Sequence, residues 1–244
     1  MKAFIFSLAI YFTISVSASS QNAEHILKKM DDTILAVKDK TADAELETTN
    51  TNTGKGNIKR AFLMQKGSDR KIFRYTYPQS DKGIATLIVP DAVYLYLPMF
   101  KKPKKITNMA QSNTFNKSAF SLSDASYLPY SMHFTPTLKE TTGTEYILEL
   151  IPKKENIAYS KLIVYINKKE HYPVKIEYYD KKNEKIKEAS YHYKKIGNYW
   201  VADVVVMTDH SKNSKSTIKM SNLKINQGLK DSDFTVEKLV PEKK

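Results

Sequence analysis

Metal-binding or nucleophilic chemistry in this 244-residue sequence would be indicated by the spacing of its histidine, cysteine and serine residues. The histidines are scattered, and no HExxH motif or other closely spaced pair indicates a metal site. They are His25, His133, His171, His192 and His210. The turn Gly-x-Ser-x-Gly, which exposes the nucleophile of many hydrolases, is absent, and there is no cysteine to supply a nucleophile, a disulfide or a thiolate ligand. We therefore expect no metal site, no cofactor and no catalytic residue.

Carboxylates add little support for catalysis. Asp31 and Asp32 are adjacent on a predicted helix, so their side chains lie about 100° apart and are poorly placed to share a substrate. Glu149 and Asp203 occupy apolar surroundings that could raise a carboxyl pKa, although either could face outward from a strand. We expect a protein that is not an enzyme, with a β-fold lipid hydrolase as the weaker alternative.

The N-terminus predicts export. One lysine precedes an apolar run of about a dozen residues, and the small residues Val16, Ser17 and Ala18 follow it. This run is shorter than the roughly 20 residues that a membrane-spanning helix needs. We predict a signal peptide over residues 1–18, with cleavage after Ala18 or, alternatively, after Ser20.

The remaining residues, 19–244, are predicted to form a single domain with a strongly basic exterior, because the net charge is +13. The densest basic cluster contains four lysines, which could dock an anionic head group or a partner protein, or could simply protect a strand edge. They are Lys101, Lys102, Lys104 and Lys105. Nucleic acid is not an expected partner, because export removes it and no base-stacking motif is present.

One amphipathic helix is predicted over residues 23–38. Ile26, Met30, Ile34 and Val37 recur at three- and four-residue intervals and form one apolar stripe. Such a helix would pack on a sheet and close one end of a cavity.

The stretch from Gly83 to Ile106 organises the rest of the chain. It predicts a hairpin of two strands, 84–89 and 92–97, with apolar side chains on both faces of each strand. In a sheet with one solvated face, apolar and polar residues would alternate along each strand. They do not alternate here, so we expect both faces of this hairpin to be covered.

Alternating patterns and turn signals predict about eleven antiparallel strands and only one long helix. The strands other than the hairpin are expected at residues 42–49, 58–66, 71–77, 145–151, 160–167, 174–179, 189–195, 199–210 and 216–225. A sheet of that size must curl to bury one face. The predicted fold is mainly β (α+β): a strongly curved, incomplete antiparallel β-barrel with an N-terminal helix.

Residues 106–136 form a long polar segment with large apolar residues at intervals, which is more typical of a binding loop than of disorder. We interpret it as a short helical lid over the cavity, although a packed surface loop would have the same composition. The predicted lid contacts are Phe115, Phe120, Tyr127 and Leu128.

Several motifs, in order along the chain, resemble the outer-membrane lipoprotein-sorting protein family, the LolA-like periplasmic carriers. The matching stretches are AEHILKKMD at 23–31, VYLYLP at 93–98 with the lysines that follow, SAFSLSDASY at 118–127, GNYW at 197–200 and NQGLKDSDF at 226–234. Where the family is commonly acidic after the Ser-Asp-x-Ser-Tyr motif, this chain has Leu128-Pro129. The arginine that latches the lid in these carriers has three candidates here, Arg60, Arg70 and Arg74.

The resemblance implies a half-open barrel whose helical lid covers an apolar cavity for the acyl chains of lipoproteins or lipids. It implies a monomeric periplasmic carrier that shuttles this cargo toward the outer membrane, between an inner-membrane donor protein and an outer-membrane acceptor protein, with transient contact to membrane surfaces. Some relatives instead sense such ligands and regulate other proteins. The residues predicted to line the cavity, each of which could equally be ordinary core, are Phe62, Met64, Phe73, Tyr75, Leu87, Val89, Leu95, Leu97, Leu148 and Trp200.

Overall fold

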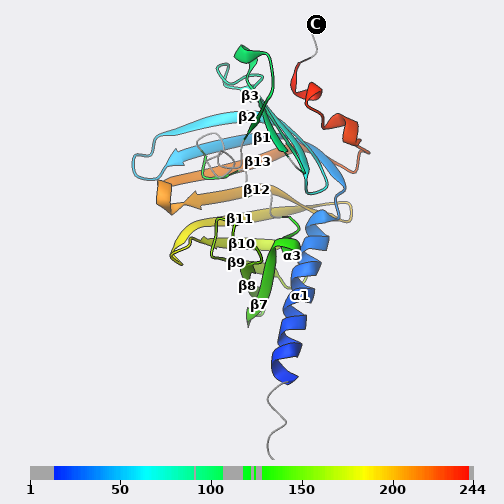
Figure 1. Cartoon of the computed structure of the whole chain (residues 1–244), viewed down its shortest axis with the longest axis vertical. Helices are drawn as coiled ribbons and strands as arrows, with labels where there is room; N and C mark the ends of the chain where they lie inside the picture. The colour runs from blue at the N-terminus through cyan, green and yellow to red at the C-terminus, as the bar shows by residue number, and fades with distance from the viewer. Residues whose placement is uncertain (1–13, 91, 107–117, 122–123, 125–127, 242–244) are drawn as a thin grey trace, which may run out of the picture.

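A single curved antiparallel sheet dominates the computed structural model, which describes residues 14–90, 92–106, 118–121, 124 and 128–241 (Figure 1). Its strand order is β6-β5-β4-β3-β2-β1-β13-β12-β11-β10-β9-β8-β7. The first and last strands therefore pair in the middle of the sheet, and the two edges, β6 and β7, come from the middle of the chain. These edges do not pair with each other in the described residues, so the sheet stays open.

Neighbouring strands are mostly consecutive in sequence, joined by short polar turns. The first group is β1 (Asp39–Asn50), β2 (Gly56–Lys66), β3 (Arg70–Tyr77), β4 (Ala85–Val89), β5 (Ala92–Tyr96) and β6 (Lys104–Ile106). The second group is β7 (Phe134–Thr141), β8 (Glu145–Pro152), β9 (Lys161–Asn167), β10 (Pro173–Tyr179), β11 (Lys185–Ile196), β12 (Tyr199–Asp209) and β13 (Ser214–Ile225).

The predicted count of eleven strands was wrong, because the structure has thirteen in the described part of the chain. The two missed strands are the edges. β6 is only three residues long and two of them are lysines, and β7 contains Pro136 in a polar run that includes Lys139 and Glu140. Proline and charge are what edge strands tolerate, since one side of an edge strand needs no partner, and they hide the alternation that identifies a strand.

Helix α1 (Ile14–Leu35) lies along the concave side of the sheet, beside β7 (Figure 1). Ala23, Ile26, Leu27 and Met30 are buried, as the predicted stripe requires. The helix begins earlier and ends earlier than predicted, and both predicted cleavage positions fall within it. Cleavage itself stays a prediction. Among the residues whose side chains are described, the first buried one in this helix is Ala23. No helix in the described residues is long and apolar enough to cross a membrane.

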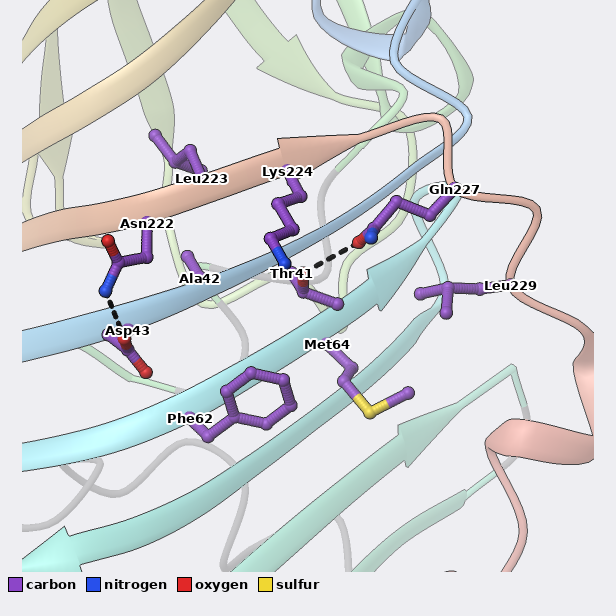
Figure 2. A pocket seen from close by; sticks show the side chains of 10 residues that line it. All are labelled: Thr41, Ala42, Asp43, Phe62, Met64, Asn222, Leu223, Lys224, Gln227 and Leu229. Carbon is purple, nitrogen blue, oxygen red and sulfur yellow. Dashed lines mark hydrogen bonds between the residues drawn. The ribbon is translucent and has the colours of Figure 1, made fainter.

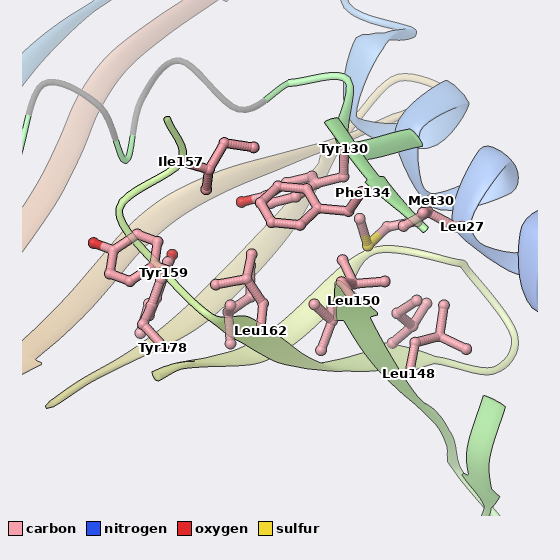
Figure 3. Close-up of a cluster of buried hydrophobic side chains, with 14 of the residues drawn as sticks. Leu27, Met30, Tyr130, Phe134, Leu148, Leu150, Ile157, Tyr159, Leu162 and Tyr178 are labelled. Atoms are coloured by element: carbon pink, nitrogen blue, oxygen red, sulfur yellow. The ribbon is translucent and has the colours of Figure 1, made fainter. Parts of the chain in front are cut away.

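The main hydrophobic core lies between α1, the short helix α3 (Tyr130–His133) and strands β7 to β11 (Figure 3). Leu27 and Met30 of α1 meet inward side chains of the sheet such as Leu148, Leu150 and Leu162. Alternation along β9, where Leu162, Val164 and Ile166 are fully buried, sets this inward face.

A second core cluster lies on the opposite, convex face. Ile72 pairs with Leu87 across β3 and β4, and both pack against Phe234 and Leu239 of the C-terminal segment 229–240. On the concave face of the same strands, Ile88 packs with Val93 of β5. Both faces of the predicted hairpin are therefore covered, as its apolar pattern indicated. In Figure 1 the C-terminal segment lies outside the sheet, beside β1 to β3.

Candidate functional site

A cavity of about 200 Å³ lies on the concave side, between the C-terminal end of α1 and the middle strands of the sheet. Its wall combines apolar, aromatic and charged side chains. It is lined by Ile34, Val37, Asp39, Lys40, Gln65, Lys71, Asp124, Leu128, Tyr130, Tyr191, Tyr193, Trp200, Val201, Ala202, Val205 and Met220. Sites that enclose a whole drug-sized ligand are usually larger, about 300–1,000 Å³, so this cavity has room for a small ligand or for one end of a longer ligand.

One wall is aromatic. Tyr193 of β11 stacks on Tyr172 with ring centroids 4.3 Å apart, and Tyr172 also contacts Trp200 of β12 at 5.1 Å. The indole Nε1 of Trp200 donates a hydrogen bond of 2.9 Å to Glu170. Burial raises the pKa of Tyr191 to about 12 and raises that of Tyr193 further above its ordinary value. These hydroxyls stay neutral near pH 7, so the wall presents flat rings with fixed polar tips.

The opposite wall is charged. Lys40 of β1 pairs with Gln65 of β2, and Gln65 pairs with Lys71 of β3, so the three side chains form a row across three strands on one face. Lys71 is only 5% exposed, whereas Lys40 keeps part of its surface accessible because it lines the cavity. Burial lowers the pKa of each lysine to about 8, and the charge of Lys40 contributes to the shift at Lys71.

Two carboxylates of the cavity wall are already engaged by the protein. Asp39 accepts hydrogen bonds from the backbone N–H groups of residues 227, 228 and 229, which anchors the start of the C-terminal segment. Asp124 accepts from the hydroxyl of Tyr159 and from the backbone N–H of Ser121, and forms an ion pair with Lys187 at 3.2 Å. Both acids therefore hold the walls of the cavity together.

The start of α3, where Tyr130 lines the cavity, is held in place by a buried aspartate. Asp31 of α1 is 2% exposed, and its two carboxylate oxygens accept hydrogen bonds of 2.8 Å from the backbone N–H groups of Tyr130 and Ser131. It thereby satisfies the free amides at the start of α3. Burial raises the pKa of Asp31, and the two amide hydrogen bonds oppose that shift. Its neighbour Asp32 forms an exposed ion pair with Lys28, so the two carboxylates do point apart. The sequence placed both on a solvated helix face, and this was wrong for Asp31, which is buried because it binds the amides of α3.

A family model described as "Uncharacterized protein" matches residues 67–240, which is well over half of the chain. The chain belongs to this family. No curated protein matches the sequence.

Solved structures show the fold. A domain from Vibrio parahaemolyticus assigned to outer membrane lipoprotein sorting superposes with a TM-score of 0.82 at 24% identity, over 91% of this chain and 100% of that one. A DUF1329 family protein from Desulfovibrio piger gives 0.82 at 22% identity, over 91% and 99%. A LolA superfamily protein from Nitrosomonas europaea gives 0.73 at 21% identity, over 87% and 97%. The chain therefore has the LolA-like fold, as the sequence resemblance predicted.

Of the residues predicted to line the cavity of this LolA-like fold, Trp200 lies in its wall. Phe73, Tyr75 and Leu95 share the concave face, since they alternate with the convex residues of β3 and β5. Leu148 is on that face too, but it is fully buried in the main core beneath α1.

Four other predicted lining residues lie on the convex face. Leu87 and Val89 belong to the cluster beneath the C-terminal segment. Phe62 and Met64 line a separate, wide groove of about 730 Å³ between β1, β2, β13 and Leu229 (Figure 2). Alternation indicated that these residues are covered, but it does not say which side of a curved sheet is the inside. Leu97 is half-buried just beyond β5.

The predicted lid residues divide in two. Leu128 lines the cavity and packs against the main core, and Phe120 also packs against that core. Phe115 and Tyr127 lie outside the described residues. Leu128 is itself part of the departure from the family pattern noted in the sequence, and its side chain reaches the cavity.

All four lysines predicted to dock a head group or partner are exposed, around η1 (Pro98–Phe100) and β6 at one edge of the sheet. Beside them Met99 is 78% exposed and Phe100 is 50% exposed. The Nζ of Lys104 lies 4.8 Å from the centre of the Phe100 ring. The structure therefore brings the lysines together with apolar surface at the edge, away from the residues that line the cavity.

The three arginines have other partners. Arg60 pairs with Glu45, and Arg70 pairs with Asp69 and Asp231. Arg74 donates hydrogen bonds to the backbone carbonyls of residues 238 and 239, which holds the C-terminal segment on the convex face. In the described part of the chain, none of them reaches the segment predicted to be the lid.

Sequence reasoning missed the polar residues of the cavity, above all Lys40 and Lys71. A signal was available for Lys71, because it alternates with the aromatic residues Phe73 and Tyr75 and so shares their face. Lys40 gives a weaker signal, because the apolar residues that alternate with it, Ala42, Ala44 and Leu46, lie in a strand that is otherwise polar. No group of three histidine, aspartate or glutamate side chains that could hold a metal occurs among the described residues.

Proposed function

We propose that the protein is a periplasmic carrier that binds an acyl chain of a lipoprotein or lipid on its concave side and moves it toward the outer membrane. In this proposal it acts as a monomer, without catalysis or cofactor, and exchanges cargo with an inner-membrane donor protein and an outer-membrane acceptor protein.

The observation that carries the proposal is the cavity itself. It lies between an aromatic wall and the end of α1, inside a LolA-like fold, and its floor continues into the main core through Leu128 and Tyr130. Each buried methylene would contribute about 0.8 kcal/mol, so an acyl chain of about sixteen carbons could gain on the order of 10 kcal/mol if fully sheltered. A cavity of about 200 Å³ holds only part of such a chain, so complete burial requires displacement of Leu128 and its neighbours.

In this proposal the protein contacts the membrane with the edge formed by η1 and β6. Its four lysines would meet anionic head groups, and exposed Met99 and Phe100 would contact the apolar boundary beneath them. Export through the predicted signal peptide brings the protein to the compartment where such surfaces occur.

The direct test is native mass spectrometry of protein purified from the periplasm, with a fluorescent fatty-acid displacement assay beside it. We expect a co-purified acyl lipid, or a bound probe that added lipid displaces. A protein that arrives without lipid and takes up no probe contradicts the carrier function. Hydrolysis of a lipid ester in the same assay would contradict the absence of catalysis.

A matched pair of variants separates the two faces. Leu95→Arg places a charge on the concave face, whereas Phe62→Arg places the same charge on the convex groove, where the ring is already 38% exposed. We expect probe uptake to fall about tenfold or more in Leu95→Arg and to stay near the wild-type value in Phe62→Arg. Equal uptake by both folded variants would remove Leu95 from the lining.

A sensor or protein-binding module is the second candidate, and the convex groove favours it. The groove is larger than the concave cavity and exposes Phe62 beside Met64 and Leu229, without cover from the described residues (Figure 2). If the protein has this function, Phe62→Arg abolishes capture of a periplasmic protein partner while lipid uptake is unchanged.

A further inference from the structure

The row formed by Lys40, Gln65 and Lys71 gives the cavity one strongly polar end. Adjacent strands are about 4.8 Å apart, so the Cα atoms of the two lysines are separated by roughly 10 Å, with Gln65 between them. The Gln65 amide is fixed in place, because its Nε2 donates a hydrogen bond of 2.8 Å to the carbonyl of Gly67. Two ammonium groups that reach inward from this separation can approach one small anion from both sides.

Charge balance within the cavity leaves room for such an anion. Asp39 is occupied by three backbone N–H groups, and Asp124 by Ser121, Tyr159 and Lys187. No residue in the described part of the chain forms an ion pair or a hydrogen bond with the ammonium of Lys40. Burying the ammonium of Lys40 without a counter-ion is costly, which is consistent with its lowered pKa of about 8.

The other end of the cavity is apolar. Leu128, Tyr130 and Ile34 lead from the charged row toward the core beneath α1, and the rings of Tyr193 and Trp200 form the side wall. A ligand that matches both ends must combine a negative group with a hydrocarbon chain.

We propose that the cavity binds a single-chain amphiphile with a carboxylate or phosphate end, with the anion between Lys40 and Lys71 and the chain directed toward Leu128 and the core under α1. This inference rests on the proposed carrier function and names the class of its cargo. It distinguishes a free acid or a phosphate ester from an acyl chain attached through a neutral ester or amide, which has no charge to place between the lysines.

Trp200 supplies the readout, because it lies in the cavity wall and is the single tryptophan of the chain. Its fluorescence is titrated with dodecanoate, dodecyl phosphate and dodecanol, which share one chain and differ only at the head. We expect at least one of the two anions to bind about tenfold or more tightly than the alcohol, because charge-assisted hydrogen bonds are the stronger ones. The anion that binds more tightly identifies whether the natural head is a carboxylate or a phosphate.

Lys40→Met tests the assignment. We expect it to weaken binding of the preferred anion by about tenfold or more, while binding of dodecanol stays within about twofold. Lys71→Met should act in the same direction and serves as a second variant if the first is unstable. The matched control is Lys219→Met, an exposed lysine on the convex face of β13, which should leave all three affinities unchanged.

The outcomes distinguish a failure of this inference from a failure of the proposed carrier function. If the two anions and the alcohol bind equally well, and Lys40→Met changes none of them, the anionic cargo is wrong and the carrier function stands. If none of the three ligands changes Trp200 fluorescence or displaces a fluorescent fatty acid, the carrier function is itself wrong. Unchanged dodecanol binding by Lys40→Met shows that this variant is folded.

Discussion

Lys187 and Lys40 both extend from the concave face of the sheet, yet their surroundings differ completely. Lys187 is 5% exposed and has two carboxylates beside it, Asp124 at 3.2 Å and Asp209 at 4.0 Å. Lys40 lines the cavity and forms no ion pair with any described residue. The protein thus balances one interior lysine internally and leaves the other beside open space. This difference is the basis for proposing that the second lysine, unlike the first, binds a ligand.

The ion pair of Lys187 has a structural role, because it joins three distant parts of the chain. Asp124 belongs to the segment predicted to be the lid, Lys187 to β11 and Asp209 to the end of β12. Asp209 is fully buried, and its Oδ2 atom has no hydrogen bond within the described residues, so it depends on the nearby positive charges of Lys187 and Lys212. Removing Lys187 would leave Asp124 without its ion pair and would leave Lys212 as the one lysine beside Asp209 among the described residues.

Exchanging each lysine for methionine is the strongest way to break this comparison. Lys187→Met should lower the free energy of unfolding by about 3–5 kcal/mol, because it breaks the buried ion pair with Asp124 and removes one of two lysines beside Asp209. Lys40→Met should leave it unchanged or raise it, since an apolar side chain there buries no charge. Urea denaturation of both variants measures the difference. Equal destabilisation would show that Lys40 has a structural role as well.

Asp31 extends the comparison to a buried carboxylate, whose partners are backbone amides rather than charged side chains. Asp31→Asn should lower the free energy of unfolding at pH 7 by about 1–3 kcal/mol, since one of the two N–H groups at Tyr130 and Ser131 loses its acceptor. The pH dependence has a definite sign. Because the folded-state pKa of Asp31 is raised, its contribution is fully present below the unfolded value of 3.8 and is lost as the pH rises through the folded value.

The measurement for Asp31 is denaturation of wild type and Asp31→Asn at several values from pH 4 to pH 7. The stability advantage of the wild type should be largest at the acidic end of this range. An advantage that grows toward pH 7 would mean that the amide hydrogen bonds outweigh burial at this carboxylate.

For Lys40 and Lys71 the expected pH dependence of stability has the opposite sign to that of Asp31, and it occurs at alkaline pH. Burial lowers the pKa of Lys40 and Lys71 to about 8, from 10.5, so between these values the unfolded chain binds more protons than the folded one. The free energy of unfolding should therefore rise with pH across this window, by on the order of 1–3 kcal/mol for each lysine. The free energy of unfolding is compared between wild type and Lys40→Met at pH 7.5 and about pH 10. The contribution of tyrosine titration is common to both proteins and cancels in this comparison. If the variant gains as much as the wild type, Lys40 is already solvated.

The smallest expected effect concerns the aromatic wall. Glu170→Gln replaces a charged acceptor of the Trp200 indole by a neutral one, so we expect a loss of about 0.5–1.5 kcal/mol and a shift in tryptophan emission. Glu155→Gln, at an exposed turn, is the matched control and should change neither stability nor emission. An unchanged emission in Glu170→Gln would mean that this hydrogen bond does not hold the ring in solution.

Much of the fold could be predicted from the sequence, because local patterns determine it. The stripe of α1 and the two-sided hairpin of β4 and β5 were readable from residue periods alone. The strands β6 and β7 were not, because their short, charged or proline-containing sequences suit an edge and look like a loop.

The site was harder to predict, because alternation of side chains along a strand separates two faces but does not show which face becomes the concave one. Phe62 and Phe73 follow equally good alternating patterns, yet Phe62 lies in the convex groove and Phe73 on the concave face. Which face is concave depends on the direction of curvature and on where α1 and the C-terminal segment pack, and these are properties of the whole chain. Lys40 could be recognised only after its register with Gln65 and Lys71 was known.

The pairing of β1 with β13 has a consequence for how the molecule is made. Lys40 lies opposite Ile225 and Asn50 opposite Ser214, so the two halves of the sheet join through residues that are 164 to 185 positions apart in the chain. Contacts of such long range form late, because the intervening loop must first be closed. A chain leaving the ribosome therefore cannot complete its sheet before its last strand has been synthesised. If the chain is exported as predicted, this strand order would delay the finished structure until the last strand has crossed the membrane.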